Sequence, residues 1–336
     1  MRIAVLGSGS WGVALSVLAF RAGGEVCLWG RDAQKIGALE RTRRSPFFSD
    51  VELPPIEFQT DLGSALEGSH LVVCALPSSV LPHVAREIAP IIPNGTVVVS
   101  GTKGLHPETL ERASQIWLGA GLDASRFVAL SGPNLAREIV AGVPTSSVVA
   151  STSPDASRRA QSAFDAPAFR VYTNADLLGV ELGGALKNVV AIAAGIGDGR
   201  GFGDNAKAAL MTRHWREMAR LAEALGARES TLWGLSGLGD LLATCASAQS
   251  RNHRLGYLLG QGSSLEDAKR EIAQTVEGVH TCRAALELGQ KHGVFLPVTQ
   301  GLGVILWGGV PVERVLAGLL NRVGRSEGED DLPQMG

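Results

Sequence analysis

A lysine in the middle of an apolar segment is the most informative chemical feature of this sequence. Residues 180–194 predict a helix that is apolar on nearly every face, and such a helix belongs in a core. Lys187 and Asn188 lie at its centre, and a buried ammonium is unfavourable unless another group pairs with it. Gly184 and Ala191 would share the face of Lys187, and their small size leaves room for a ligand. Lys187 is therefore a candidate functional residue, and the alternative is a core helix whose lysine reaches out to water.

A second group of polar residues has the composition of a phosphate site. Ser250, Arg251 and Asn252 stand at the start of a helix that the apolar pattern predicts from residue 252. Free N–H groups at a helix start, the helix dipole and a guanidinium all favour phosphate. Asp240 follows a Gly-rich turn, where a helix N-cap is the alternative to a role in a site. Glu277 could bind a ribose hydroxyl or simply lie on the surface.

The N-terminal glycines predict a dinucleotide site. Gly7, Gly9 and Gly12 form a GxGxxG pattern between a strand predicted at residues 2–6 and a helix predicted at residues 13–22. This strand–turn–helix context is what makes the pattern informative. Gly7 would make the tight turn, Gly9 would admit the pyrophosphate, and Gly12 would allow the helix to pack on the strand.

The end of the second predicted strand selects the cofactor. A site specific for NAD usually places an acid there for the ribose 2′-hydroxyl, whereas this chain has Gly30, Arg31 and Asp32. Arg31 suits a 2′-phosphate, which favours use of NADP. The alternative is that Arg31 covers the adenine while Asp32 binds the ribose.

Two more polar residues follow predicted strands. Lys103 lies between glycines at the carboxyl end of a strand, where it could reach an anion or be an ordinary loop lysine. Asn134 follows the next strand and is expected to be the N-cap of the helix that begins with residues 135–138. Ligands of doubly wound sheets lie beyond the carboxyl ends of the strands, which places both residues at the expected edge.

The order of elements predicts an α/β fold with two domains. Strands and helices alternate through residue 173, which indicates a Rossmann-type, doubly wound, mainly parallel sheet over residues 1–178. Residues 179–324 predict an all-α domain for substrate and catalysis, and residues 325–336 a disordered tail. Within the α domain, five glycines predict a loop after the helix of Lys187: Gly195, Gly197, Gly199, Gly201 and Gly203.

The composition excludes several classes of protein. The net charge of −2 gives no general basic surface for nucleic acid, and no apolar run reaches the roughly 20 residues of a transmembrane segment. The four cysteines are far apart, so we expect no disulfides and a cytoplasmic location. No HExxH motif occurs, and His280 and Cys282 alone are weak evidence for a metal, so none is expected.

The sequence resembles the bacterial NAD(P)-dependent glycerol-3-phosphate dehydrogenases from Met1 to about Arg322. The resemblance rests on a series of motifs in order: GSGSWG, LWGR, GTKGL, GPNLAREI, ELGGALKNVVAIAAGIGDGRGFGDNAKAALMTR, GLGDL, SRN and VEG. It implies the reversible reduction of dihydroxyacetone phosphate to sn-glycerol 3-phosphate for phospholipid synthesis, with NADP(H) or NAD(H) and a homodimeric enzyme. Rival interpretations are a related two-domain 3-hydroxy acid dehydrogenase and a non-catalytic dinucleotide sensor.

The resemblance also assigns roles to residues. Lys187 matches the family's catalytic lysine, its proton donor and acceptor. The predicted substrate contacts are Lys103, Gly132, Asn134, Lys187, Asn188, Asp240, Ser250, Arg251 and Asn252. The predicted cofactor contacts are Gly7, Gly9, Ser10, Trp11, Gly12, Arg31, Asp32, Lys103, Ala136, Arg251 and Glu277. Asn134 stands where the family usually has Ser or Thr, and His214 where a glycine is common.

Overall fold

The computed structural model describes residues 1–320, which form two compact units. The first comprises residues 1–103 and 111–181, and the second residues 104–110 together with the chain from Leu182 onward. The sequence did not predict that residues 104–110 belong to the second unit. The predicted tail at 325–336, and the last residues of the predicted α domain, lie outside the described residues.

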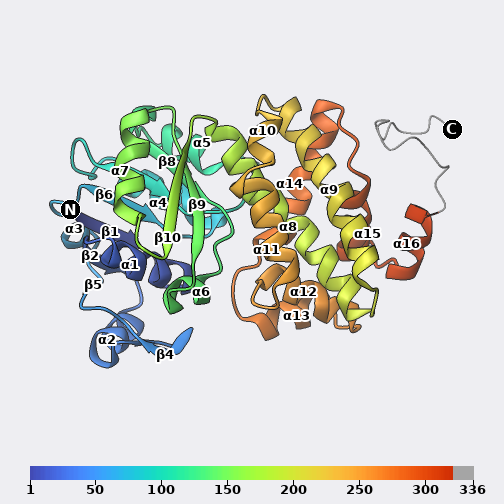
Figure 1. Cartoon of the computed structure of the whole chain (residues 1–336), viewed down its shortest axis with the longest axis horizontal. Helices are drawn as coiled ribbons and strands as arrows, with labels where there is room; N and C mark the ends of the chain where they lie inside the picture. Colours follow the sequence, from blue (N-terminus) through green and yellow to red (C-terminus); the bar gives the residue numbers. More distant parts are fainter. Residues whose placement is uncertain (321–336) are drawn as a thin grey trace. The chain divides into compact units, whose positions relative to one another are not determined.

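The first unit contains an eight-stranded sheet of order β10-β9-β8-β7-β6-β1-β2-β5 (Figure 1). Its strands are β1 (Arg2–Leu6), β2 (Glu25–Trp29), β5 (Glu57–Gln59), β6 (Leu71–Cys74), β7 (Val97–Ser100), β8 (Phe127–Ser131), β9 (Thr145–Ala150) and β10 (Phe169–Asn174). All neighbouring pairs are parallel except β8 and β9. In the antiparallel pair, the end of β8 lies beside the middle of β9, because Ser131 pairs with Val148.

Helices cover both faces of this sheet, as its residue pattern requires. They are α1 (Ser10–Arg21), α2 (Ala33–Thr42), α3 (Leu62–Leu66), α4 (Leu81–Ile88), α5 (Ala113–Gly119), α6 (Ala136–Ala141) and α7 (Pro154–Phe164). Ile3 and Val5 of β1 belong to the cluster that packs against α1 and α7, while Ala4 and Leu6, which alternate with them along the strand, are equally buried. Burial on both faces explains the continuous apolar strands and confirms the doubly wound prediction.

A short antiparallel ribbon lies outside the main sheet. It consists of β3 (Arg44–Ser45) and β4 (Phe48–Glu52), and Phe48 is buried in the core of the unit. Arg137 of α6 forms an ion pair of 2.8 Å with Asp50 of β4. The basic stretch at residues 41–48 is therefore an ordered excursion from the sheet.

The described residues of the second unit form helices and their connections and contain no strand, as predicted (Figure 1). Its helices are α8 (Leu177–Gly199), α9 (Asp204–Ala224), α10 (Glu229–Leu232), a π-helical turn (Leu235–Gly239), α11 (Asp240–Ala246), α12 (Arg251–Gly260), α13 (Leu265–Ile272), α14 (Glu277–His292), α15 (Pro297–Gly308) and α16 (Val312–Leu320). The apolar side chains of α8, α12, α13, α14 and α15 form its core.

The predicted loop at residues 195–203 is wrong in its first half, because α8 continues to Gly199. A Cβ atom on Gly195 would lie 2.0 Å from the carbonyl oxygen of His253, and one on Gly199 would lie 2.4 Å from that of Tyr257. On α12, a Cβ atom on Gly256 would lie 1.9 Å from the carbonyl oxygen of Ile192. These glycines therefore bring the backbones of α8 and α12 into direct contact.

The length and apolar composition of α8 would also suit a membrane span. However, 78% of its most apolar window is buried inside the structure. Lys187 and Asn188 lie in the middle of the helix and are buried there as well. These features are those of a core helix, which the sequence predicted.

Candidate active site

The GxGxxG turn has the geometry of a dinucleotide site. Gly7 has φ +117°, and a Cβ atom there would lie 2.8 Å from the carbonyl oxygen of Ala75. A Cβ atom on Gly12 would lie 1.7 Å from the carbonyl oxygen of Gly7, so the helix could not pack on the strand with a side chain at this position. A Cβ atom on Gly9, in contrast, would meet nothing within 4 Å. This open space fits the close approach of a pyrophosphate.

The start of α1 leaves donors for that anion. Gly9 is the N-cap of α1 and contributes no side-chain cap. The N–H groups of Ser10, Trp11 and Gly12 therefore have no intrahelical partner, which is the arrangement that binds phosphate. The Trp11 indole donates a hydrogen bond of 3.0 Å to the carbonyl oxygen of Gly101 and thereby ties α1 to the loop after β7.

Three predicted site residues of the first unit lie together. The Lys103 ammonium donates a hydrogen bond of 2.7 Å to the carbonyl oxygen of Gly132 and lies 5.8 Å from the centre of the Trp11 ring. Gly132 has φ +131°, a backbone conformation that side chains rarely adopt. Lys103, Gly132 and Trp11 thus join the ends of β7 and β8 to the start of α1.

Asn134 does not cap a helix, so that prediction is wrong. Leu135 is the N-cap of α6, and Ala136 is its first residue. Asn134 Nδ2 instead donates a hydrogen bond of 3.1 Å to Ser147 Oγ on β9. Its Oδ1 is buried and has no hydrogen-bond partner among the described residues. An unpaired buried acceptor is costly, which fits a position that a ligand donor completes.

Asp32 and Arg31 have different environments. Asp32 is the N-cap of α2 and accepts hydrogen bonds of 3.1 Å from the backbone N–H groups of Gln34 and Lys35. These bonds, with that from Lys35 the strongest influence, lower the pKa of the carboxyl group. Arg31 is exposed and makes no hydrogen bond or ion pair within residues 1–320. The carboxylate is thus engaged locally while the guanidinium remains available for a 2′-phosphate.

In the second unit, Lys187 has two buried partners. Its Nζ lies 3.1 Å from Asp240 Oδ1 and donates a hydrogen bond of 2.6 Å to Thr244 Oγ1. Thr244 in turn donates a hydrogen bond of 3.1 Å to Asp240 Oδ1. The Lys187 side chain is 8% exposed and that of Asp240 3%. The ammonium therefore does not reach out to water, contrary to the alternative interpretation of the sequence.

Close backbone packing positions Asp240. The π-helical turn at Leu235–Gly239 precedes it directly, and π-helical turns often occur at functional sites. A Cβ atom on Gly237 would lie 2.0 Å from the carbonyl oxygen of Leu232. One on Gly183, a turn before Lys187 on α8, would lie 2.8 Å from the carbonyl oxygen of Ser236. Glycines on both elements thus set the separation between α8 and the carboxylate.

The residues predicted to bind phosphate lie at the start of α12. Ser250 is the N-cap, and its Oγ accepts a hydrogen bond of 3.2 Å from the backbone N–H of His253. Arg251 is solvent-exposed, yet the surrounding protein still desolvates its guanidinium and lowers its pKa, and the negative charge of Glu277 opposes this shift. The serine cap was predicted, and Arg251 and Glu277 lie close enough to interact.

Asn188 and Asn252 form a buried pair. Asn252 Nδ2 donates a hydrogen bond of 2.8 Å to Asn188 Oδ1. Asn252 Oδ1 accepts a hydrogen bond of 2.9 Å from the backbone N–H of Gly278 in α14. The sequence predicted both residues as substrate contacts and gave no sign that they contact each other.

Several polar residues close to these were missed. Thr244 lies one helical turn after Asp240, and that spacing of four residues was the available signal. Asp198 Oδ2 lies 2.7 Å from both Lys207 Nζ and His253 Nε2, which links α8 to α9 and α12. The two partners come from other helices, so no local spacing revealed them.

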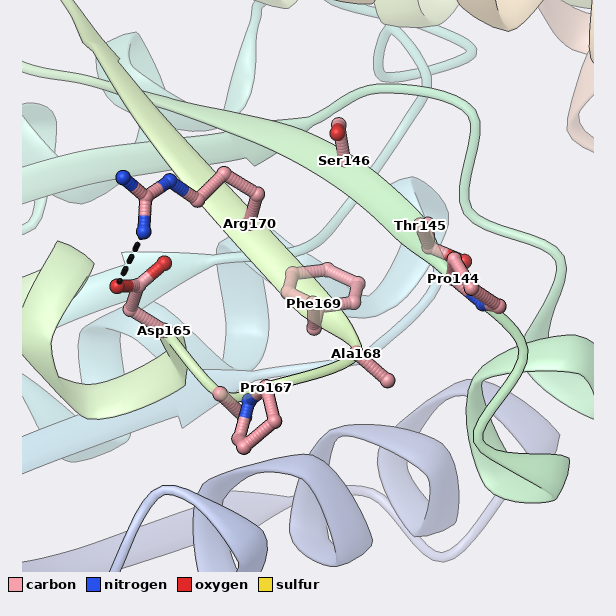
Figure 2. Close-up of a pocket in the computed structure, with 9 residues that line it drawn as sticks. Pro144, Thr145, Ser146, Asp165, Pro167, Ala168, Phe169 and Arg170 are labelled. Atoms are coloured by element: carbon pink, nitrogen blue, oxygen red, sulfur yellow. Dashed lines mark ion pairs between the residues drawn. The ribbon is translucent and has the colours of Figure 1, made fainter.

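Two cavities lie elsewhere. One of about 560 Å³ opens at the starts of β9 and β10 and is lined by residues 144–146 and 165–170. Figure 2 shows the ion pair of Arg170 and Asp165 on its wall, at 3.6 Å. A smaller apolar cavity of about 100 Å³ lies among α8, α9, α15 and α16. Neither contains a predicted site residue, and residues 1–320 contain no cluster of His, Cys, Asp and Glu suited to a metal ion.

Comparison with known proteins gives the same family for both halves of the chain. Residues 2–157 match the family described as NAD-dependent glycerol-3-phosphate dehydrogenase N-terminus, and residues 176–317 match the corresponding C-terminus. The NAD(P)+ glycerol-3-phosphate dehydrogenase of Moorella thermoacetica is 47% identical over 322 residues, which cover 95% of this chain and 96% of that protein. The corresponding enzyme of Pelotomaculum thermopropionicum is 43% identical, and the match covers 98% of this chain and 95% of that protein.

A solved structure agrees. The glycerol-3-phosphate dehydrogenase of Coxiella burnetii has a TM-score of 0.89 and 35% identity, covering 96% of this chain and 99% of that one.

Proposed function

This chain belongs to the family of NAD-dependent glycerol-3-phosphate dehydrogenases, and we propose that Lys187 is the proton donor and acceptor of its reaction. The protein is an NAD(P)-dependent oxidoreductase. The proposed reaction is the reversible reduction of dihydroxyacetone phosphate to sn-glycerol 3-phosphate, which supplies phospholipid synthesis. The observation that carries this assignment is the buried ammonium of Lys187 between Asp240 and Thr244.

The hydrogen-bonding capacity of Lys187 supports the proton-transfer role. An ammonium has three N–H donors. One points to Thr244 Oγ1 and one to Asp240 Oδ1, which leaves one for the C2 oxygen of the ketone. Negative charge develops on that oxygen as C2 accepts a hydride, so the ammonium stabilises the charge and then transfers its proton. In the reverse direction, neutral Lys187 removes the proton from the C2 hydroxyl.

Arg251 is proposed to hold the substrate phosphate. Its guanidinium, the N–H groups at the start of α12 and the positive end of the helix dipole all favour that anion. The further proposed substrate contacts are Lys103, Gly132, Asn134, Asn188, Asp240, Ser250 and Asn252. Phosphate binding would fix the ketone for reaction and so reduce the entropy lost on reaching the transition state.

The first unit is proposed to hold the cofactor. The open space at Gly9 and the free donors of α1 suit the pyrophosphate, and Arg31 suits a 2′-phosphate, which favours NADP(H) over NAD(H). A bound reduced nicotinamide supplies the hydride. Ala136, Arg251 and Glu277 are proposed to make further contacts with the cofactor. No metal is needed, because the ammonium supplies the charge stabilisation.

The resemblance to the bacterial enzymes also supports an assembly and a location. We propose a homodimer that acts in the cytoplasm on a small phosphorylated substrate, without nucleic acid. Sedimentation of the purified protein would test the dimer.

Activity with three substrates tests the function. NADPH and NADH oxidation would be followed separately with dihydroxyacetone phosphate, and the reverse reaction with sn-glycerol 3-phosphate and with 3-hydroxy acids. Turnover of dihydroxyacetone phosphate and sn-glycerol 3-phosphate, without turnover of 3-hydroxy acids, supports the proposal. Turnover of 3-hydroxy acids alone supports the related dehydrogenase, and cofactor binding without any turnover supports a sensor. Arg251→Ala should weaken substrate binding by about 1.5–3 kcal/mol, seen mainly as a higher KM.

A further inference from the structure

Three helices of the second unit meet at a chain of buried amides. Asn188 lies on α8, directly after Lys187, and its Oδ1 accepts a hydrogen bond of 2.8 Å from Asn252 Nδ2. Asn252 lies on α12, directly after Arg251, and its Oδ1 accepts a hydrogen bond of 2.9 Å from the N–H of Gly278. Gly278 is the second residue of α14, directly after Glu277. Each amide therefore follows a residue to which the proposed function gives a role.

Asn252 lies on α12, but its side chain caps the start of α14. The true N-cap, Val276, has no side-chain oxygen, and α14 has no side-chain cap of its own. The N–H of Gly278 belongs to the first turn, where no intrahelical acceptor exists. Asn252 Oδ1 supplies that acceptor in a buried position, where an unpaired donor would be unfavourable.

The backbone at Gly278 packs closely against both asparagines. A Cβ atom there would lie 2.6 Å from the carbonyl oxygen of Asn188 and 2.6 Å from Asn252 Oδ1. Even an alanine would therefore push α14 away from both α8 and α12. The start of α14 rests directly on the two asparagines.

The junction of α8, α12 and α14 also fixes the positions of two charged side chains. Arg251 and Glu277 flank it, and the Glu277 carboxylate opposes the lowering of the Arg251 pKa that desolvation causes. A shift of α14 would move Glu277 relative to Arg251. The position of both charged groups thus depends on the amides between them.

We propose that Asn188 and Asn252 are positioning residues that hold the start of α14, and with it Glu277, in register with the helix of Lys187. This inference rests on the proposed role of Glu277 in cofactor binding. It follows that Asn188, which neighbours the catalytic lysine, contributes to cofactor affinity through Asn252 and Gly278. A residue that only contacts the substrate would not do so.

The test is the Kd for NADPH, measured by calorimetry without substrate. Asn188→Ala and Asn252→Ala should each raise it by about fivefold, the factor expected for one lost hydrogen bond. Gly278→Ala should raise it at least as much, because its methyl group would displace the start of α14. Because Asn188 acts through Asn252, the double variant N188A/N252A should bind NADPH no more weakly than N252A alone. Arg254→Ala is the matched control, since Arg254 lies on the same helix and pairs with Glu271 at the surface.

Hydrogen exchange gives a second measurement that does not depend on activity. The amides at the start of α14 should exchange faster in N188A and N252A than in wild type or R254A. An unchanged Kd for NADPH in N188A, with a raised KM for dihydroxyacetone phosphate, would overturn the inference and leave Asn188 with only its proposed contact to the substrate. Additive effects in the double variant would also overturn it. An unchanged Kd in Glu277→Gln, with normal turnover in wild type, would reject the role of Glu277 while leaving the enzyme assignment intact.

Discussion

Lys187 Nζ and Asp240 Oδ1 lie 3.1 Å apart in the interior of the second unit, and both side chains are almost fully buried. Removing one member of such a pair leaves an uncompensated buried charge. Asp240→Ala should therefore lower the free energy of unfolding by about 3–5 kcal/mol. Urea denaturation measures this loss. The double variant with Lys187→Met should be less destabilised than Asp240→Ala alone, whereas a loss equal to the sum of the two single losses would show that the pair is not coupled.

The glycine contacts between α8 and α12 give a prediction about stability. Gly195→Ala and Gly256→Ala would each place a methyl group within 2.0 Å of a backbone oxygen on the other helix. Each should lower the free energy of unfolding by about 1–3 kcal/mol, because the helices must separate. Gly197→Ala is the control, since its Cβ would meet only Phe202 at 3.8 Å. That variant should be neutral or slightly stabilising, and a loss as large as at Gly195 would contradict the packing argument.

The environment of Asp198 predicts that the stability of the folded protein depends on pH. Burial tends to raise the pKa of this carboxyl group, but hydrogen bonds and charges from Lys207 and His253 outweigh it and lower the pKa below its usual 3.8. A lowered pKa stabilises the folded state above the unfolded pKa, and this stabilisation is lost as the pH falls through the folded pKa. Asp198→Asn should therefore reduce stability by about 1.5–3 kcal/mol near neutral pH.

The difference between wild type and Asp198→Asn should then shrink as the pH falls below about 4. Guanidinium titrations at several pH values check this. Asp155→Asn serves as the control, because Asp155 and Arg158 form an exposed pair at 3.4 Å. A difference that stays constant down to low pH would mean that the Asp198 charge does not contribute.

Arg31 predicts selectivity between cofactors. Arg31→Ala should weaken NADPH binding roughly tenfold, the factor for one charge-assisted hydrogen bond to the 2′-phosphate. NADH lacks that phosphate, so its binding should change little. Titration with both cofactors compares the two. An equal loss for NADH and NADPH would favour the alternative in which Arg31 covers the adenine.

The local patterns of the sequence predicted the fold well. The GxGxxG turn, the apolar strands and the Ser250 cap are set by neighbouring residues, and the structure has them where the pattern placed them. Gly195 and Gly199 were misread, because the reason for them lies on α12 rather than in the backbone conformation of a loop. A sequence alone does not distinguish glycines of a close helix crossing from glycines of a turn.

The sequence predicted which residues belong to the candidate site better than it predicted which residues they contact. Lys187 stands out because a charge in an apolar helix needs a partner, yet Thr244 and the link from Asn252 to Gly278 depend on tertiary packing. Asn134 was expected to cap α6, but its side chain turns to Ser147 on β9, a strand that follows it in the chain. Partners that come from distant segments leave no spacing in the sequence.

The most direct test of the account is the single-turnover rate of NADPH oxidation with dihydroxyacetone phosphate in wild type and Lys187→Met. Methionine keeps most of the length of the side chain and removes the ammonium group that would donate the proton. If Lys187 is the proton donor, the rate should fall roughly 10²–10⁴-fold in the variant, with the Kd for NADPH unchanged. A Lys187→Met variant that turns over as fast as wild type would contradict the assignment and leave Lys187 with a structural role.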